Sequence, residues 1–425
     1  MSYREIVTRP VLTWCLVALA ARLPVAMAPL ALVFLVRERP GGYTLGAVLA
    51  AVYVIGEILG APLFGTRLRP ERARPQLAAG LAVGGASFAG LWLAHGSGPV
   101  VLGALAFLAG AGPAAAAGGL RALLTGMVPP GAVTRAMSLE TILMSGIWAA
   151  SPALSTGLAL GVAPYAPMML AAVLMGGGAA GLWALPAGWA AEEGADGHGG
   201  GSRMRLLIGA WPVYVLGAAS MAMLALAELI LPALLEQRSI GLGWAGPLLA
   251  GFSLGSAAGA FVYGMRNWPG RPGRQCLVLL PGTCGCGVLV ALVPWTWAIG
   301  AVLVVAGAVQ AAISLARNLQ LRQILPASEL AAAYSVNYAV VGAGYAASGA
   351  LAGGLLRVVA PSTAILVGVV LTLLLSVVGL VGERRMSAAP VPGGHERVPT
   401  GTVGASAGGA EGAAADGGRD AERRR

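Results

Sequence analysis

Two apolar segments and the break between them occupy residues 103–158, which read GALAFLAGAGPAAAAGGLRALLTGMV, PPG and AVTRAMSLETILMSGIWAASPALSTGL. The pattern returns without a gap 197 positions later, as residues 300–355. Alanine and glycine matches carry little weight, because both residues are abundant throughout the chain. The informative matches pair Pro129 with Pro326, Ser138 with Ser335, and Ser151 with Ser348.

A second echo precedes the first at an offset of 199. It pairs Gly56, Gly60, Gly65 and Arg67 with Gly255, Gly259, Gly264 and Arg266. The difference of two between the offsets corresponds to one small insertion. The chain is therefore predicted to consist of two homologous halves in the same order, and a membrane protein with such internal symmetry is a transporter candidate.

The composition places the chain in a lipid bilayer. It is 57% hydrophobic and only 10% charged, where soluble proteins average about 25% charged residues, and its mean hydropathy is +0.79. The net charge of +10 comes from 27 basic residues, all arginine. Most lie in short gaps between apolar runs, which is typical of a cytoplasmic membrane face and not of nucleic-acid binding.

The apolar runs predict an all-α membrane protein with twelve transmembrane helices, since a span needs about 20 apolar residues. The first is interpreted as a retained helix and not a signal peptide. The expected spans are 11–36, 44–66, 77–95, 99–128, 133–161, 163–187, 206–234, 241–264, 276–296, 298–325, 330–356 and 361–382.

The loop arginines predict that both termini are cytoplasmic. The outer loops receive only Arg37, Arg39, Arg238 and Arg357. The inner side receives Arg4, Arg9, Arg67, Arg69, Arg72, Arg74, Arg135, Arg203, Arg205, Arg266, Arg271, Arg274, Arg322, Arg384 and Arg385.

Two segments are expected to lie outside the bundles. Residues 188–205 are acidic and glycine-rich, and we interpret them as a flexible cytoplasmic linker between a six-helix bundle over residues 1–187 and another over 206–382. Residues 383–425 are rich in Pro, Gly, Ala, Glu and Arg and have too little apolar surface to fold alone, so they are expected to form a disordered cytoplasmic tail.

Charges inside spans need a reason, because a central Arg or Asp costs roughly 2.5–3.5 kcal/mol on insertion scales. Arg22 lies in the middle of the first span beside Pro24 and Pro29. One interpretation is a contact to an anion or carboxylate in a water-filled cavity. The other is structural pairing with a buried Glu.

Glu57 lies near the middle of the second span, one turn from Tyr53 and between Gly56 and Gly60. Removal from water favours the uncharged carboxylic acid over the carboxylate, which makes Glu57 a proton-coupling candidate. The alternative is that Glu57 neutralises Arg22, and both roles are compatible. Glu228, the acidic residue inside the seventh span, is the second candidate, with pairing to Arg238 or a polar contact near the outer interface as its alternative.

Arg121 and Glu140 are expected to form an ion pair, because they lie about two turns inside the same ends of consecutive antiparallel helices. We favour a structural or gating role for the pair over substrate contact. In the second half the equivalent positions are Asn318 and Asn337.

Further residues are candidates for lining a substrate cavity. Gln310, Ser314 and Arg317 share one helix face at spacings of four and seven. Trp148 and Tyr345 are equivalent under the repeat and are expected to face each other. Such walls suit amphipathic ligands, although aromatic packing is the commoner explanation. Arg22 and Tyr53 complete the cavity candidates.

No motif supports an enzyme. The sequence contains no Walker-type loop with Lys, no His-Glu metal pattern and only three His. The four cysteines are interpreted as packing residues. We therefore predict no catalytic residue, metal or cofactor, with energy taken from an ion gradient.

On these residues the chain resembles the major facilitator superfamily, and the resemblance extends over about residues 10–382. The signature after the second span is represented by Gly65, Arg67, Arg72 and Arg74, with Arg69 where an Asp is typical. Arg121 resembles the basic residue of the fourth span, and Ser151-Pro152 stands where proton-antiporting exporters usually have Gly-Pro. The resemblance to bacterial exporters implies two six-helix bundles that rock around a central cavity, and a monomer.

Together, these observations predict a proton-coupled exporter of a small amphipathic molecule in the cytoplasmic membrane. One alternative is an importer of an anionic nutrient bound at Arg22. Another is a non-transporting membrane sensor or partner that kept the fold.

Overall fold

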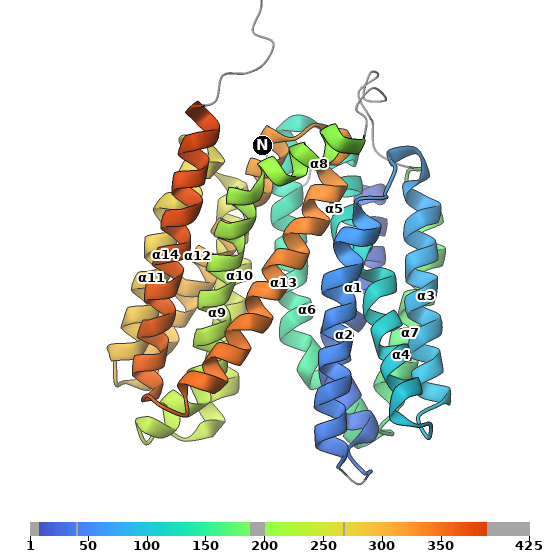
Figure 1. Ribbon diagram of the computed structural model, residues 1–425, viewed down its shortest axis with the longest axis horizontal. Coiled ribbons are helices and arrows are strands. Elements are labelled where there is room, and N and C mark those ends of the chain that lie inside the picture. The colour runs from blue at the N-terminus through green and yellow to red at the C-terminus, as the bar shows by residue number, and fades with distance from the viewer. Residues whose placement is uncertain (1–7, 40, 188–199, 267, 389–425) are drawn as a thin grey trace, which may run out of the picture. The chain divides into compact units, whose positions relative to one another are not determined.

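The computed structural model describes residues 8–39, 41–187, 200–266 and 268–388, and their regular structure is entirely helical. The helices belong to one compact unit that ends at Ser387. Figure 1 shows the helices of the second half gathered on the left and those of the first half on the right. The first-half helices are α1 (Arg9–Val36), α2 (Gly42–Gly65), α3 (Ala73–Leu93), α4 (Pro99–Ala111), α5 (Ala116–Met127), α6 (Val133–Gly161) and α7 (Ala166–Gly181). The others are α8 (Gly200–Gly209), α9 (Trp211–Gln237), α10 (Ala245–Met265), α11 (Pro272–Leu292), α12 (Thr296–Ile324), α13 (Leu330–Leu355) and α14 (Pro361–Ala388).

A helix occupies each of the twelve expected spans, and eleven helical segments of the described chain are long and apolar enough to cross a membrane. The expected span that is not among the eleven is α13, whose sequence contains Tyr, Ser and Asn together with many glycines. This polar character has a structural counterpart, because α13 packs against α9 of its own half and against α2 and α5 of the other. The twelve-span count stays a prediction.

The ends of the bundles differ from expectation in two places. Residues 200–205, expected to belong to the flexible linker, lie in α8, and α14 continues to Ala388 instead of stopping at residue 382. The rest of the expected linker (188–199), the rest of the expected tail (389–425) and Arg4 lie outside the described residues. The end of the helix bundle at which α1 begins, α8 lies and α14 ends is called the linker face below; it is at the top of Figure 1.

One expected helix is broken in the first half but continuous in the second. The span predicted for residues 99–128 divides into α4 and α5 around a 3-10 turn at Gly112–Ala115, which contains Pro113. Its counterpart α12 runs unbroken from Thr296 to Ile324. At the offset of 197, Pro113 becomes Gln310, so the proline that removes a backbone donor and crowds the preceding turn is present in only one half.

Glycines bring α2 and α4 into backbone contact. A Cβ atom on Gly56 would overlap the carbonyl oxygen of Phe107, and one on Gly110 would overlap the carbonyl oxygen of Tyr53. Small residues that let backbones approach are a common basis of helix association in membranes. These glycines therefore fix the distance between the two helices.

The same contacts recur in the second half between α10 and α12. A Cβ atom on Gly255 would overlap the carbonyl oxygen of Val304, and one on Gly307 would overlap that of Phe252. Each of these four residues is the counterpart of one in the first half, at offsets of 199 in the earlier helix and 197 in the later one. The internal repeat predicted from the sequence is thereby confirmed, residue by residue.

We expect Gly110→Ala and Gly307→Ala to destabilise the protein by similar amounts, about 1–3 kcal/mol each, because each added methyl group forces two backbones apart. The measurement is the thermal unfolding midpoint of the purified protein. Gly103→Ala, in α4 where an added Cβ meets no atom within 4 Å, is the control and should be neutral. If Gly307→Ala left the unfolding midpoint unchanged while Gly110→Ala lowered it, the α2–α4 and α10–α12 contacts would not be equivalent.

Two reciprocal helix pairs join the halves. In one pair α2 packs against α13, with Gly65 directly against Ser335. In the other, α6 packs against α10, and the Ser138 hydroxyl donates to the carbonyl oxygen of Ala260. Ser138 and Ser335 are equivalent under the repeat, so each half contributes the same two surfaces, as in a two-fold dimer interface.

Two contacts mark the position of the pseudo-twofold axis. Arg121 Nη1 donates to Asn318 Oδ1 at 3.3 Å, and Arg322 Nη1 donates to the carbonyl oxygen of Thr125 at 3.4 Å. Both bonds join residues 197 positions apart, which is the repeat offset itself. Equivalent residues meet only close to the axis that relates them, so the axis runs between α5 and α12.

Candidate functional site

Three of the candidate residues converge where α1, α2 and α13 meet. The Tyr338 hydroxyl on α13 donates a hydrogen bond to Glu57 Oε1 on α2. The guanidinium carbon of Arg22, on α1, lies 5.0 Å from the centroid of the Tyr338 ring. All three side chains are half-buried. A titratable acid of the first half is thus bonded to a side chain of the second.

The direct pairing of Arg22 with Glu57 that the sequence left open is not what the structure shows. No ion pair joins the two among the described residues, and Tyr338 contacts both of them. The two opposite charges still lie close enough to influence one another. The Tyr338 ring attracts the Arg22 guanidinium by a cation–π interaction, and the Tyr338 hydroxyl donates a hydrogen bond to the Glu57 carboxylate.

Tyr53 belongs to the same cluster. It is fully buried, and its ring lies 6.4 Å from that of Phe88. Its hydroxyl has no hydrogen-bond partner in the described protein, although Glu57, Tyr338 and Arg22 are all near enough for charge interactions. A buried hydroxyl without a protein partner is costly, so the structure holds Tyr53 there at an energetic cost.

Tyr338 was missed in the sequence although a signal for it exists. Tyr334, Tyr338 and Tyr345 are spaced by four and seven residues on α13, which puts them within about 40° of one another on the helix. Each lies beside charged candidates: Tyr334 beside Arg121, Tyr338 beside Glu57 and Arg22, and Tyr345 beside Glu228. Three tyrosines on one face of a single expected span were the available clue.

Glu228 has Tyr345 as its neighbour and not Arg238. The half-buried Glu228 carboxyl lies close enough to Tyr345 for the two groups to interact electrostatically. Arg238 instead donates to the carbonyl oxygen of Ala291, near the end of α11. Its counterpart Arg39 donates at 2.8 Å to the carbonyl oxygen of Ser97, just after α3, so both arginines satisfy carbonyls at a helix end.

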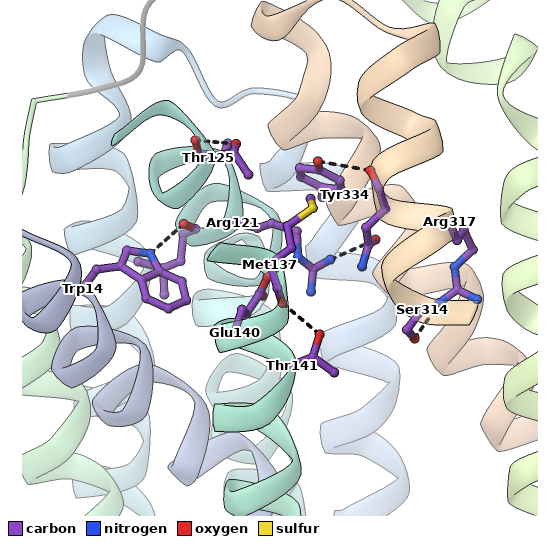
Figure 2. Close-up of polar contacts among 12 residues, drawn as sticks. Trp14, Arg121, Thr125, Met137, Glu140, Thr141, Ser314, Arg317 and Tyr334 are labelled. Carbon is purple, nitrogen blue, oxygen red and sulfur yellow. Dashed lines mark hydrogen bonds and ion pairs between the residues drawn. The ribbon is translucent and has the colours of Figure 1, made fainter. Parts of the chain in front are cut away.

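The ion pair expected between Arg121 and Glu140 is present. Arg121 Nε lies 2.7 Å from Glu140 Oε2, with side-chain exposures of 14% and 5%. Figure 2 shows Arg121 between Glu140 and Tyr334. Arg121 donates to Asn318 Oδ1 of the second half, and its guanidinium carbon lies 5.2 Å from the centroid of the Tyr334 ring. The Tyr334 hydroxyl donates to the carbonyl oxygen of Asn318 at 3.4 Å. The Arg121–Glu140 ion pair therefore also contributes to the contact between the two halves.

The structure buries the other polar candidates of the second half. The Asn337 side chain is 4% exposed and its Oδ1 has no partner among the described residues; Gln310 is 6% exposed and neither of its amide atoms has one. Arg317 is 3% exposed. It donates to Ser220 Oγ on α9 at 3.0 Å and to Ser314 Oγ on its own helix at 3.4 Å, so it lies inside the second half and not between the halves.

Trp148 and Tyr345 are exposed, at 57% and 37%. The expected ring contact between them is not among those of the described residues. Trp148 lies about one turn beyond Ser145 on α6, and Tyr345 lies about two turns beyond Tyr338 on α13; Ser145 and Tyr338 make the outermost polar contacts of these helices with the other half.

The four signature residues after α2 have different surroundings. Gly65 packs against α13, and Arg74 donates to the carbonyl oxygen of Leu185 while lying over the Trp183 ring at 5.9 Å. Arg67 and Arg72 are exposed. Gln76 orders the loop by accepting from the Arg69 amide and donating to the Arg67 carbonyl oxygen, so a neutral amide holds the turn.

The two helix pairs that join the halves, α2–α13 and α6–α10, are called seams here, and they differ in the polar residues that connect them. At the offset of 199, Glu57 becomes Ser256, and at 197, Tyr338 corresponds to Thr141. Where α2 and α13 are joined by Tyr338 and Glu57, α6 and α10 are joined by Ser145 and Ser256, whose hydroxyl oxygens are 3.0 Å apart. The Tyr338–Glu57 contact contains a titratable carboxyl, and the Ser145–Ser256 contact contains two neutral hydroxyls. In the described part of the chain, no group of three or more His, Cys, Asp or Glu could hold a metal ion.

Solved structures of transporters share this fold. The human organic anion transporter MFSD10 (TETRAN) is 16% identical over 89% of this chain and 100% of its own, with a TM-score of 0.65. A bacterial homologue of the iron transporter ferroportin, in an outward-facing state, is 15% identical over 89% of this chain and 100% of its own, with a TM-score of 0.68. No protein-family model and no curated protein matches the sequence. The chain has the fold of major facilitator superfamily transporters.

Proposed function

We propose that the protein is a secondary active transporter that moves a small molecule by alternating access, and that it is not an enzyme. The observation that carries the proposal is the convergence of Arg22, Glu57 and Tyr338 between two equivalent halves. Charged groups within spans are expensive and mark substrate or ion pathways. A membrane protein with a purely structural role would not need charged groups at the surface between its two halves.

The contacts between the halves support alternating access. The polar contacts cited above all lie in the parts of α2, α6, α10 and α13 nearest the linker face, and the exposed Trp148 and Tyr345 lie about one and two turns farther along α6 and α13. A transporter closed at one membrane face and ready to open there would place its contacts in this way. We assign the linker face to the cytoplasm, with both termini inside, as the loop arginines predict.

Proton coupling is proposed to act through Glu57, with Glu228 as second carrier. Protonation of Glu57 removes the negative charge that receives the Tyr338 hydrogen bond, and charge-assisted bonds are about twice as strong as neutral ones. The α2–α13 seam would then weaken. The Ser145–Ser256 contact of the α6–α10 seam contains no group that titrates at physiological pH, so it would be retained.

Export of an amphipathic compound fits the exposed rings of Trp148 and Tyr345 together with Glu228. Import of an anionic nutrient at Arg22 is less well supported, because that guanidinium already faces Tyr338 and Glu57. MFSD10 is an organic anion transporter. Among the described residues of the present chain, the buried arginine that forms no ion pair is Arg317. We further propose a monomer in the cytoplasmic membrane, without a cofactor, composed of bundles over residues 1–187 and 206–382.

Replacing Tyr338 by Phe should move the pH dependence of transport upward by about one pH unit. A hydrogen bond donated to a carboxylate favours its charged form, and bonds to charged groups contribute about 1.5–3 kcal/mol. Without the hydroxyl, Glu57 takes up its proton at higher pH. Flux is measured across a pH series in proteoliposomes. Thr141→Val, the change at the equivalent position of α6, should leave the pH dependence of flux unchanged. A shift equal to that of Tyr338→Phe would mean that Glu57 is not the coupling group.

The proposed function is tested in two steps. Cells lacking the gene are first screened with a compound panel, and the compound whose tolerance or uptake changes most becomes the probe. Loss of tolerance indicates export, and loss of uptake indicates import. Probe flux is then measured in proteoliposomes under an imposed pH gradient. A probe that raises the thermal unfolding midpoint but never crosses the vesicle membrane would overturn transport in favour of a sensor.

A further inference from the structure

An apolar groove lies on the outside of the second half, between the start of α9 and the end of α14. It has a volume of about 270 Å³ and is lined by Trp211, Val377, Val378, Val381 and Gly382. Gly382 is required there, because an added Cβ would meet the indole ring of Trp211 at 2.5 Å. The lining side chains of Val377 and Val378 are about half exposed, so the groove is open to the membrane.

Exposed basic residues lie on the two helical segments at the linker-face end of this groove, the end of α14 and α8. Arg384 follows Val377 and Val381 at spacings of seven and three, which places it on the same side of α14. Its side chain is exposed. Arg205, also exposed, lies on α8, the helix that leads directly into Trp211. Neither arginine forms an ion pair within the described chain.

The neighbouring acidic residue does not cancel this charge. Glu383 accepts a hydrogen bond from Gln320 Nε2 of α12 at 2.6 Å, which turns its carboxylate toward the interior of the bundle. Arg203, the other described arginine of α8, is already paired with Glu329 at 2.5 Å. The unpaired positive charge on the groove side of α14 is therefore that of Arg384, and Arg205 is an unpaired arginine on the neighbouring α8.

A second groove provides an internal comparison. It lies between α10 and α12 at the opposite end of the bundle, has a volume of about 480 Å³, and is lined by Trp244, Pro247, Leu248, Gly251, Thr296, Trp297, Gly300 and Val304. None of these residues is charged. An apolar groove thus occurs at both ends of the second half. Among the described residues, only the first of these two grooves has an exposed arginine without an ion pair, Arg384, on the helix side that lines it.

We propose that the groove between α9 and α14 binds an anionic phospholipid, with one acyl chain against Val377, Val381 and Trp211 and the phosphate at Arg384. Aromatic residues sit at the level of the lipid headgroups, which is where Trp211 would lie. Basic pockets between helices on the cytoplasmic side hold anionic headgroups. The proposal does not depend on what the protein transports.

The test measures lipid binding to the purified full-length chain in detergent by native mass spectrometry. Phosphatidylglycerol is compared with phosphatidylcholine of identical acyl chains. The unaltered protein should prefer phosphatidylglycerol, and Arg384→Gln should reduce that preference about fivefold, as expected for one basic residue near a membrane surface. Val381→Trp, which fills the groove, should remove the bound lipid.

Matched controls keep the result interpretable. Arg357→Gln removes an exposed arginine from the opposite end of the same half and should leave the preference unchanged, as should Val304→Trp in the second groove. Arg384→Gln lies on the surface and leaves the fold intact even if Val381→Trp does not. Equal retention of both lipids, or equal losses from Arg384→Gln and Arg357→Gln, would overturn the proposal.

Discussion

Replacing Glu57 by Gln is expected to abolish flux driven by a pH gradient while leaving the protein folded. Glutamine keeps the size of the side chain and can still accept a hydrogen bond from Tyr338, but it carries neither a charge nor an exchangeable acid proton. The seam between α2 and α13 then no longer responds to protons. The measurement is probe accumulation in proteoliposomes with an imposed gradient, compared with exchange of the same probe at equal pH on both sides.

The expected signature is the loss of accumulation with exchange retained, because binding and rocking do not require the proton. Ser256→Ala, at the equivalent position of the neutral seam, is the matched control and should retain accumulation. Undiminished accumulation by Glu57→Gln would remove Glu57 from the coupling mechanism. Loss of both accumulation and exchange would indicate that Glu57 is required for rocking itself.

Removing the Arg121 guanidinium is expected to cost about 3–5 kcal/mol, the usual effect of breaking a buried ion pair by truncating one partner. Arg121→Gln leaves Glu140, whose side chain is 5% exposed, as an uncompensated buried carboxylate. It also removes the bond to Asn318 that joins the halves beside their axis. The thermal unfolding midpoint of the purified protein should therefore fall sharply.

The second half supplies the control for this experiment. It already has Asn318 and Asn337 at the positions of Arg121 and Glu140, so a neutral pair is compatible with the fold. The double variant Arg121→Asn/Glu140→Asn should thus recover most of the stability lost in Arg121→Gln. If the double variant is as unstable as the single one, charge burial is not the cause of the loss.

The architecture was largely predictable because the repeat occurs in the residues themselves. Glycines and prolines that match at fixed offsets specify backbone features, so equivalent glycines such as Gly110 and Gly307 make equivalent contacts. The break between α4 and α5 could have been read from Pro113, which has no counterpart in the second half. The helical residues 200–205 were harder to anticipate, because a glycine-rich start gives no apolar pattern before Leu206.

The partners in the candidate site were predicted less well. Arg121 and Glu140 were paired correctly because a short connection between neighbouring helices fixes which residues share a depth. Glu57 and Tyr338 are 281 positions apart and lie on helices of different halves, and the sequence spacing within each helix does not specify that contact. Arg238 was considered a partner for Glu228, but a carbonyl at a helix end holds it instead.

By itself, the sequence determined that this chain crosses a membrane many times as two copies of one unit, because hydropathy and matched glycines and prolines are local properties that each copy carries. Only the tertiary structure decided that Tyr338 contacts both Glu57 and Arg22, that Arg317 is enclosed within one half, and that the titratable Tyr338–Glu57 contact between the halves has the neutral Ser145–Ser256 contact on the other side. These facts depend on how the copies face each other. Side-chain pairing across that surface arises from distances that no pattern along the chain records.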